Sequence, residues 1–210
     1  MNTQKITVLL VLILALIVIL IAKRKRKIEM NKGEMEVNDV LEKITGYRLL
    51  SNVMIKRENG TSQIDHILIG RKGVFVIETK DFSGKIYGDQ YSKYWTQKLN
   101  GRKNTFYNPI RQNYGHVKAL EEILKRRDIF ISLIVFTNKS KIKNIKSEVP
   151  VIQLKKLKKY IRKYKSDITL SKDEVSEIYN IINKKNIISN RAIKKHVKRL
   201  RKANYNWKLK

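Results

Sequence analysis

Two adjacent apolar strands joined by a tight turn constrain this chain more than any other feature. Residues 63–80 read QIDHILIGRKGVFVIETK, with the turn at Gly70-Arg71-Lys72-Gly73. Strand side chains alternate between two faces, so Glu78 and Lys80 are predicted to point the same way. The hairpin then brings Asp65 alongside them. The sequence therefore predicts two carboxylates and one ammonium group on one side of a small sheet.

That group of side chains can bind a hard divalent cation and activate a water molecule beside it. The alternative is a pair of solvated charges at a strand end, because a Glu-x-Lys triplet arises readily in a chain so rich in both residues. Asp65 favours the first interpretation, since a charge inside an apolar strand is costly unless it has a partner. The chain has no Cys, which excludes disulfides, thiolate metal sites and Cys nucleophiles.

The charge balance points to polyanionic partners. Lys and Arg together number 47 against 18 Asp and Glu, a formal net charge of +29. Most of the excess lies from Lys139 onward, whereas Ile28 to Asn138 is only mildly basic. Nucleic acid and anionic lipid are the two natural partners for such a surface.

An apolar run near the N-terminus predicts an uncleaved membrane anchor. Ile6 to Ala22 is apolar apart from Thr7, and about 17 residues is the short end of what spans a bilayer. A cleaved signal peptide is the alternative, but the basic cluster Lys23–Lys27 follows the run and no small-x-small site comes after it. The cluster can contact anionic lipid, and the positive-inside rule places it in the cytoplasm. We therefore expect a single-pass protein of the cell membrane with a cytoplasmic C-terminal domain.

The rest of the chain alternates between helix and strand patterns, which indicates an α/β fold. Asn108 is expected to cap a helix that begins at Pro109, and Ser171 opens another with a capping box. Helices are predicted at 31–44, 109–126, 154–165 and 171–185, the last with Val175, Ile178, Ile181 and Ile182 buried. Further strands are predicted at 47–56, 94–99, 103–107, 129–137 and 149–154. We divide the chain into an anchor with its basic cluster (1–27), a domain (28–138) and a basic helical extension (139–210).

An ordered series of motifs resembles the nuclease-related domain, NERD, of the PD-(D/E)xK, restriction-endonuclease-like superfamily. The motifs are Gly33-Glu34-x-x-Val37, Ile64-Asp65-His66, the strand Gly73 to Lys80, Trp95, and Asn108-Pro109-x-x-Gln112-x-x-x-His116. They span residues 32–137. The resemblance implies a mixed central sheet flanked by helices, here preceded by a transmembrane helix and followed by basic helices.

The resemblance also implies roles for individual residues. Asp65 and Glu78 match the metal-binding carboxylates, which with the Thr79 carbonyl would hold Mg²⁺ or Mn²⁺. Lys80 matches the lysine that positions or deprotonates the attacking water. Beside a metal ion its pKa is expected to be lowered, as suits a general base.

Two helices and a strand add five further residues to consider. Glu34 matches a helix glutamate that joins the site, with Glu36 as its rival, and Gln112 matches a polar residue on the later helix. His116 lies one helical turn beyond Gln112 and either packs or reaches the edge of the site. His66 is expected to pack away from Asp65 if the strand is regular.

The expected function is metal-dependent hydrolysis of DNA or RNA phosphodiester bonds at the cytoplasmic face of the membrane. One alternative is a membrane-tethered module that binds nucleic acid without cutting it. The other is an interaction protein whose basic C-terminal region binds anionic lipid or a protein partner.

Overall fold

The computed structural model describes residues 8–18, 30–58 and 60–187. Residues 8–18 form a helix with exposed apolar side chains. Within the described ranges, no helix is both long and apolar enough to cross a membrane. The predicted anchor Ile6–Ala22 lies only partly inside these ranges. The cluster Lys23–Lys27 and the basic residues 188–210 lie outside them.

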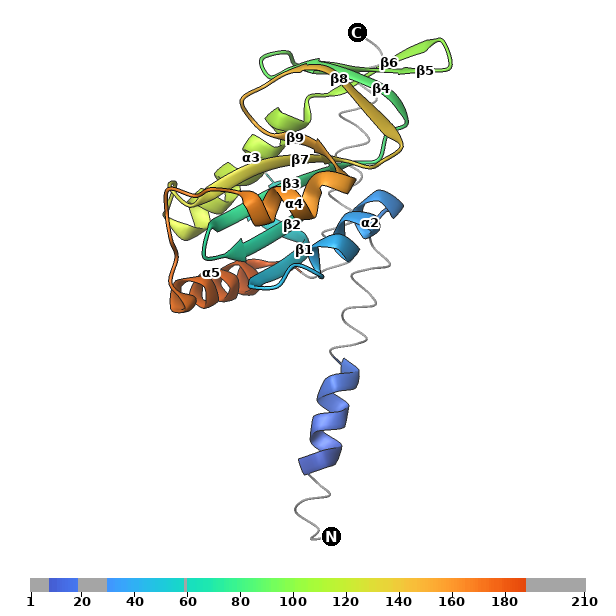
Figure 1. Ribbon diagram of the computed structural model, residues 1–210. Helices are drawn as coiled ribbons and strands as arrows, with labels where there is room; N and C mark the ends of the chain where they lie inside the picture. The colour runs from blue at the N-terminus through green and yellow to red at the C-terminus, as the bar shows by residue number, and fades with distance from the viewer. Residues whose placement is uncertain (1–7, 19–29, 59, 188–210) are drawn as a thin grey trace.

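The centre of the molecule is a five-stranded mixed sheet (Figure 1). Its strands are, in spatial order, β1 (Tyr47–Arg57), β2 (Gly60–Gly70), β3 (Gly73–Lys80), β7 (Phe130–Phe136) and β9 (Val151–Gln153). β1, β2 and β3 pair antiparallel, whereas β7 and β9 extend the sheet in parallel with β3. The predicted hairpin is therefore the middle of the sheet, which explains why β3 is apolar on both faces.

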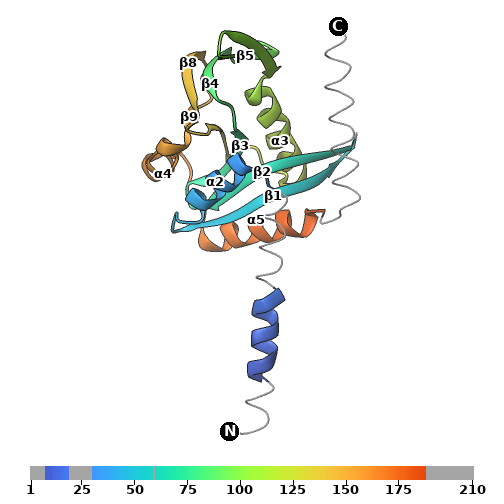
Figure 2. The same cartoon turned by 90° about the vertical axis from the view of Figure 1, so that its right-hand side faces the viewer.

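Helices cover both faces of this sheet (Figure 2). One face carries α3 (Pro109–Leu124) and α5 (Lys172–Lys185), and the other carries α2 (Lys32–Leu41) and α4 (Leu154–Lys163). Each pair encloses its own apolar core against the sheet. The predicted caps form, because the Asn108 side chain accepts from the Ile110 N–H and Ser171 makes a capping box with Glu174. The chain is thus a mixed α/β protein, as its patterns predicted.

A second sheet packs at the end of the first. Its strands are, in spatial order, β6 (Arg102–Tyr107), β5 (Tyr94–Leu99), β4 (Gly84–Asp89) and β8 (Ser140–Lys146). Its inner face buries Ile86 and Trp95 against Phe136 of β7, with the Trp95 and Phe136 rings stacked. The sequence analysis expected one central sheet and missed β4 and β8. Both are short, glycine- or lysine-containing segments that become strands by pairing, β4 with both β5 and β8, and β8 with β4.

The elements after residue 138 are integral to both sheets and both cores. β8 is the edge of the second sheet and β9 the edge of the first. On α5 three of the four residues predicted to be buried, Val175, Ile178 and Ile182, are buried against β1 and β2, whereas the prediction was wrong for Ile181, which is only partly buried.

This packing predicts the cost of truncating α5. Ile182 is fully buried, so Ile182→Ala should lower the free energy of unfolding by about 2–5 kcal/mol. Ile181→Ala is the matched control, because the neighbouring side chain is only partly buried and should lose less. Urea unfolding followed by tryptophan fluorescence measures both. Equal losses would show that α5 does not close the core.

Candidate functional site

The site forms where the ladder between β2 and β3 ends. The last paired residues are His66 and Ile77, so the same register places Asp65 opposite Glu78. There the Thr79 N–H donates to Asp65 Oδ2 at 2.8 Å instead of to the backbone of β2. Because the N–H and C=O of one strand residue point to the same side, the Thr79 carbonyl also faces the Asp65 end of β2.

Strand alternation changes at the same point. Asn52 in β1, whose position opposes Asp65, has a left-handed backbone with φ of 53°. Ile64 and Ile67, three residues apart in β2, lie in the same core, which a regular strand would not allow. The local break therefore releases Asp65 from the regular pleat that the sequence analysis assumed.

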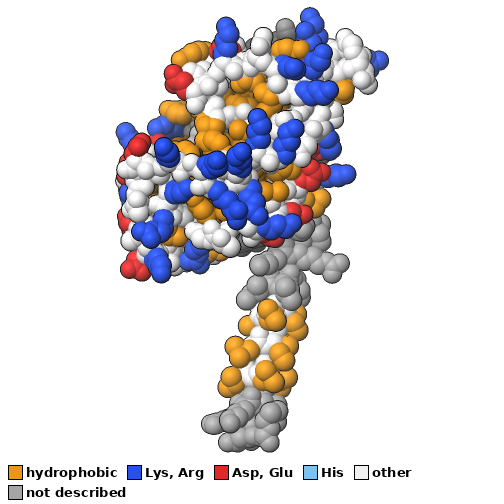
Figure 3. Space-filling view, viewed as in Figure 1, with side chains coloured by type: hydrophobic (Ala, Val, Ile, Leu, Met, Phe, Trp, Pro, Cys, Tyr) orange, Lys and Arg blue, Asp and Glu red, His pale blue; other side chains and the backbone are white. Residues whose placement is uncertain are grey.

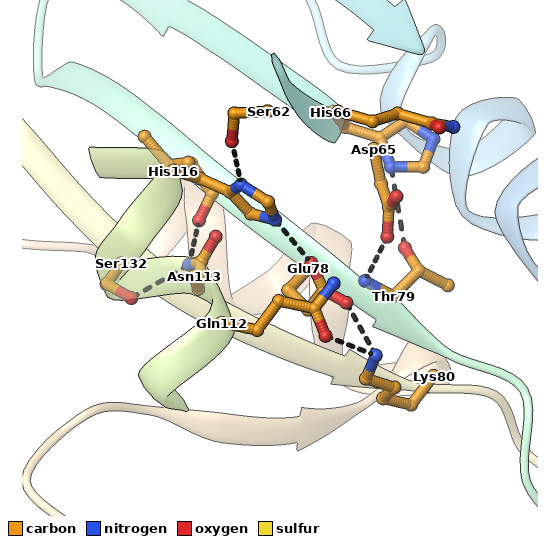
Figure 4. Close-up of polar contacts among 12 residues, drawn as sticks. Ser62, Asp65, His66, Glu78, Thr79, Lys80, Gln112, Asn113, His116 and Ser132 are labelled. Carbon is orange, nitrogen blue, oxygen red and sulfur yellow. Dashed lines mark hydrogen bonds and ion pairs between the residues drawn. The ribbon is translucent and has the colours of Figure 1, made fainter. Parts of the chain in front are cut away.

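Glu78, Lys80 and Gln112 meet as the motif order suggested (Figure 4). Lys80 Nζ lies 2.6 Å from Glu78 Oε1 and donates to Gln112 Oε1 at 2.9 Å. Glu78 is almost fully buried, whereas the Lys80 side chain is 18% exposed. The ammonium group is thus held between a sheet carboxylate and an amide from α3, close to solvent.

His116 and Ser62 fix the other oxygen of Glu78. His116 Nε2 lies 3.1 Å from Glu78 Oε2, and Ser62 Oγ lies 2.7 Å from His116 Nδ1. The order Ser–His–Glu is that of a hydrolase triad. Ser62, however, is only 7% exposed, so its hydroxyl is not placed to attack a substrate. These contacts therefore orient Glu78. Helical spacing from Gln112 allowed His116 to reach the site, whereas no sequence signal singled out Ser62.

Glu34 is the carboxylate that α2 contributes. It is buried, closes a capping box with Asn31, and interacts electrostatically with Glu78 and Lys80. Glu36 is only partly buried and lies in the field of Lys139 instead. Between the two rivals, the structure therefore places Glu34 beside the other charges.

The pKa values of the three carboxyl groups shift in opposite directions. Burial, with repulsion from Glu78 and Glu34, holds the pKa of Asp65 well above its ordinary value. Burial likewise raises the pKa of Glu34 to about 7. Burial also opposes ionisation of Glu78, but Lys80 and His116 outweigh it and lower the pKa of that carboxyl. The surroundings therefore favour the ionised form of Glu78 and the protonated form of Asp65.

The basic groups show one agreement and one difference. Burial lowers the pKa of His66 to about 4, so this fully buried imidazole is neutral, in keeping with a packing role. Desolvation also acts to lower the pKa of Lys80, but attraction to Glu78, Asp65 and Glu34 prevails and raises it. Around these side chains alone, the pKa shift of Lys80 is thus opposite to the lowered value expected beside a metal ion.

The oxygen atoms suit a small hard cation. Asp65, Glu78 and the Thr79 carbonyl offer two carboxylates and one backbone oxygen at one strand end. No cluster of three or more His, Asp or Glu arranged for metal binding occurs in the described part of the chain. An ion here would accordingly keep several waters, as Mg²⁺ does when one or two carboxylates hold it.

Fold and site together define a mixed α/β domain with a carboxylate–lysine centre at a strand end, consistent with a nuclease-like domain. The model of the nuclease-related domain family, NERD, matches residues 30–137. The chain belongs to this family. It is also similar to an uncharacterized protein of Bacillus anthracis, at 40% identity over 174 residues, which covers 80% of this chain and 82% of the other. No solved structure matches the chain.

The raised pKa of Glu34 predicts a pH-dependent stability. The folded protein retains a proton that the unfolded chain releases above pH 4.5, so stability should fall as pH rises from there to about 7. Glu34→Gln keeps the capping box and removes this loss. Without divalent cations the variant should match wild type at pH 4 and exceed it at pH 8 by at most about 3 kcal/mol. Urea unfolding at both pH values measures this, with Glu36→Gln as control; a constant difference would contradict it.

Proposed function

We propose that this domain is a metal-dependent nuclease of the PD-(D/E)xK, restriction-endonuclease-like kind, which hydrolyses phosphodiester bonds of DNA or RNA. The observation that carries the proposal is the meeting of Asp65, Glu78 and Lys80 where the β2–β3 ladder opens. Membership of the nuclease-related domain family supports it.

Each residue has a distinct task in such a reaction. Asp65, Glu78 and the Thr79 carbonyl would hold Mg²⁺ or Mn²⁺, which when bound supplies charge stabilisation for the phosphate and an activated water. Gln112 and Glu78 hold the Lys80 ammonium group. As an ammonium group paired with Glu78, Lys80 would orient the attacking water and offset charge on the phosphate. His116 keeps Glu78 in place, and Glu34 adds a third carboxyl group nearby.

We further propose that the protein acts at the membrane. Residues Ile6–Ala22 would form the anchor and Lys23–Lys27 would contact anionic lipid, with the domain on the cytoplasmic side.

Topology is testable with a reporter that works only outside the cytoplasm. Fused to Lys210 it should give no signal, whereas fused before Asn2 it should give a strong one, because the basic cluster follows the apolar run. A strong signal from the C-terminal fusion would remove the domain from cytoplasmic nucleic acid.

A second candidate is a module that binds nucleic acid without cutting it. The firm Lys80–Glu78 ion pair favours this alternative, because it must open or share Glu78 before an ion can bind. Metal binding and cleavage therefore have to be measured separately.

Cleavage should depend on Lys80 and metal binding should not. With the full chain, labelled DNA or RNA and Mn²⁺, Lys80→Ala should slow cleavage at least about a hundredfold and still bind Mn²⁺. Asp65→Ala should lose both, because it removes an anionic ligand. Lys72→Ala is the matched control in the same hairpin, since its ammonium group donates to the Arg162 carbonyl, outside the site. Calorimetry in two buffers of different ionisation enthalpy should show net proton release on Mn²⁺ binding, because the raised pKa of Asp65 favours its protonated form before an ion binds.

The two candidates then separate. Binding of Mn²⁺ without cleavage of either nucleic acid would leave the non-catalytic module. Absence of Mn²⁺ binding would leave Asp65, Glu78 and Lys80 without the role proposed for them.

A further inference from the structure

The outer face of the second sheet carries a row of lysines in register across all four strands. Lys141 of β8 pairs with Lys85 of β4, Lys85 with Lys98 of β5, and Lys98 with Lys103 of β6. Residues that pair directly point to the same face. At a strand spacing of about 4.8 Å, the row extends about 14 Å across the sheet.

This row costs stability, which the contact of the Lys98 ammonium group with the Tyr87 ring, 4.8 Å from the ring centroid, offsets only in part. Like charges directly opposite one another in a sheet are destabilising. All four lysines are exposed, and none makes an ion pair within the part of the chain that the structure describes. The row is thus complementary to a line of negative charges.

Aromatic rings stand beside the row on the same face. Tyr87 of β4 pairs with Thr96 of β5. Two residues before Thr96, Tyr94 of β5 faces the same side and pairs with Tyr107 of β6. The Tyr94 and Tyr107 rings meet edge to face at 6.3 Å, and Tyr107 is 45% exposed. The inner face of the sheet takes the apolar contacts through Ile86, Trp95 and Phe106. Among the described residues, no apolar core includes a side chain of the outer face.

We propose that this outer face is a platform for single-stranded nucleic acid, with phosphates on the lysine row and bases stacked on the tyrosines. Only unpaired bases present their ring faces, and sheet-borne aromatics beside basic side chains are a recurrent way to bind them. A lipid surface fits less well, because the face offers no aliphatic side chain for insertion.

The platform adjoins the candidate active site along the chain. β4 begins four residues after Lys80, and β6 ends at Tyr107, just before the helix that carries Gln112. A strand bound there would be the substrate of the site, so the inference rests on the proposed function for its biological role. Binding itself is measured without cleavage.

The test compares two double variants of the full chain, in mild detergent with EDTA. Labelled twelve-nucleotide single strands, oligo-dT and oligo-U, are titrated by fluorescence anisotropy over a series of salt concentrations. Lys98→Gln with Lys103→Gln should weaken binding and reduce the salt slope by about 1.4, because each phosphate contact in a single strand contributes about 0.7. Lys158→Gln with Lys159→Gln makes the same charge change on exposed residues of α4, a helix with Lys and Arg side chains on the face shown in Figure 3, and should leave the slope unchanged. Equal losses in both variants would overturn the platform.

Ring stacking has its own test. Tyr107→Leu should weaken single-strand binding roughly fivefold or more, whereas Tyr114→Leu, an exposed tyrosine of α3, should not. Unchanged binding by Tyr107→Leu, or equal binding of a duplex of the same length, would contradict the proposal. So would loss of phosphatidylserine vesicle binding by the Lys98/Lys103 variant with oligonucleotide binding intact.

Folding and function are separated by two controls. The Lys98/Lys103 variant should unfold at the same or a higher urea concentration than wild type, because it relieves like-charge repulsion. A wild-type protein that binds oligonucleotides but does not cleave them with Mn²⁺ would end the nuclease proposal and leave the platform standing. If wild type cleaves with Mn²⁺ and the Lys98/Lys103 variant binds as tightly as wild type, the platform proposal fails and the nuclease proposal stands.

Discussion

The site depends on one hydrogen bond: the Thr79 N–H donates to the Asp65 side chain at the point where the β2–β3 ladder would otherwise continue through a backbone carbonyl of β2. A buried backbone donor must find an acceptor, so the carboxyl group can lie inside the sheet only because it takes that role. The same contact parts β2 from β3, turns the Thr79 carbonyl toward the opening, and leaves Asp65 opposite Glu78. The helices on the two faces of the sheet then supply the other residues around this gap between β2 and β3.

Residues from the helices help to set which carboxyl group in the gap is ionised. One ammonium group, Lys80, faces three carboxyl groups in a mostly buried setting, so only the best-partnered of them, Glu78, is readily ionised. The cap of α3 positions Gln112 and His116 over Glu78, and the capping box of α2 holds Glu34. Local helix-start signals thereby become elements of the site. Asp65 and Glu34, whose pKa values are raised, lie near the Thr79 carbonyl. A divalent cation that binds there can displace a proton from such a carboxyl group.

The second sheet shows a different balance. Its inner face secures it to β7 through Trp95 and Phe136, while its outer face places four lysines in line without anionic partners among the described residues. The sheet can tolerate that repulsion because the apolar contacts beneath it are extensive and the lysines reach solvent. Regular pairing then converts lysines from distant segments of the chain into a single ordered row.

Resemblance to the family predicted Gln112 beside the site, whereas strand periodicity, turn residues and caps in the sequence were enough to predict the α/β class, the central hairpin, the helices and the proximity of Asp65, Glu78 and Lys80. These features are local, or follow from one short hairpin, so few residues decide them. Tertiary structure alone decided the rest: β4 forms by pairing with β5 and β8, Ser62 reaches His116 across 54 residues, and Glu34 rather than Glu36 lies buried beside the other charges. Among the protein's own groups the pKa of Lys80 is raised, because it depends on the summed field of Glu78, Asp65 and Glu34, and no single segment of the chain contains that sum.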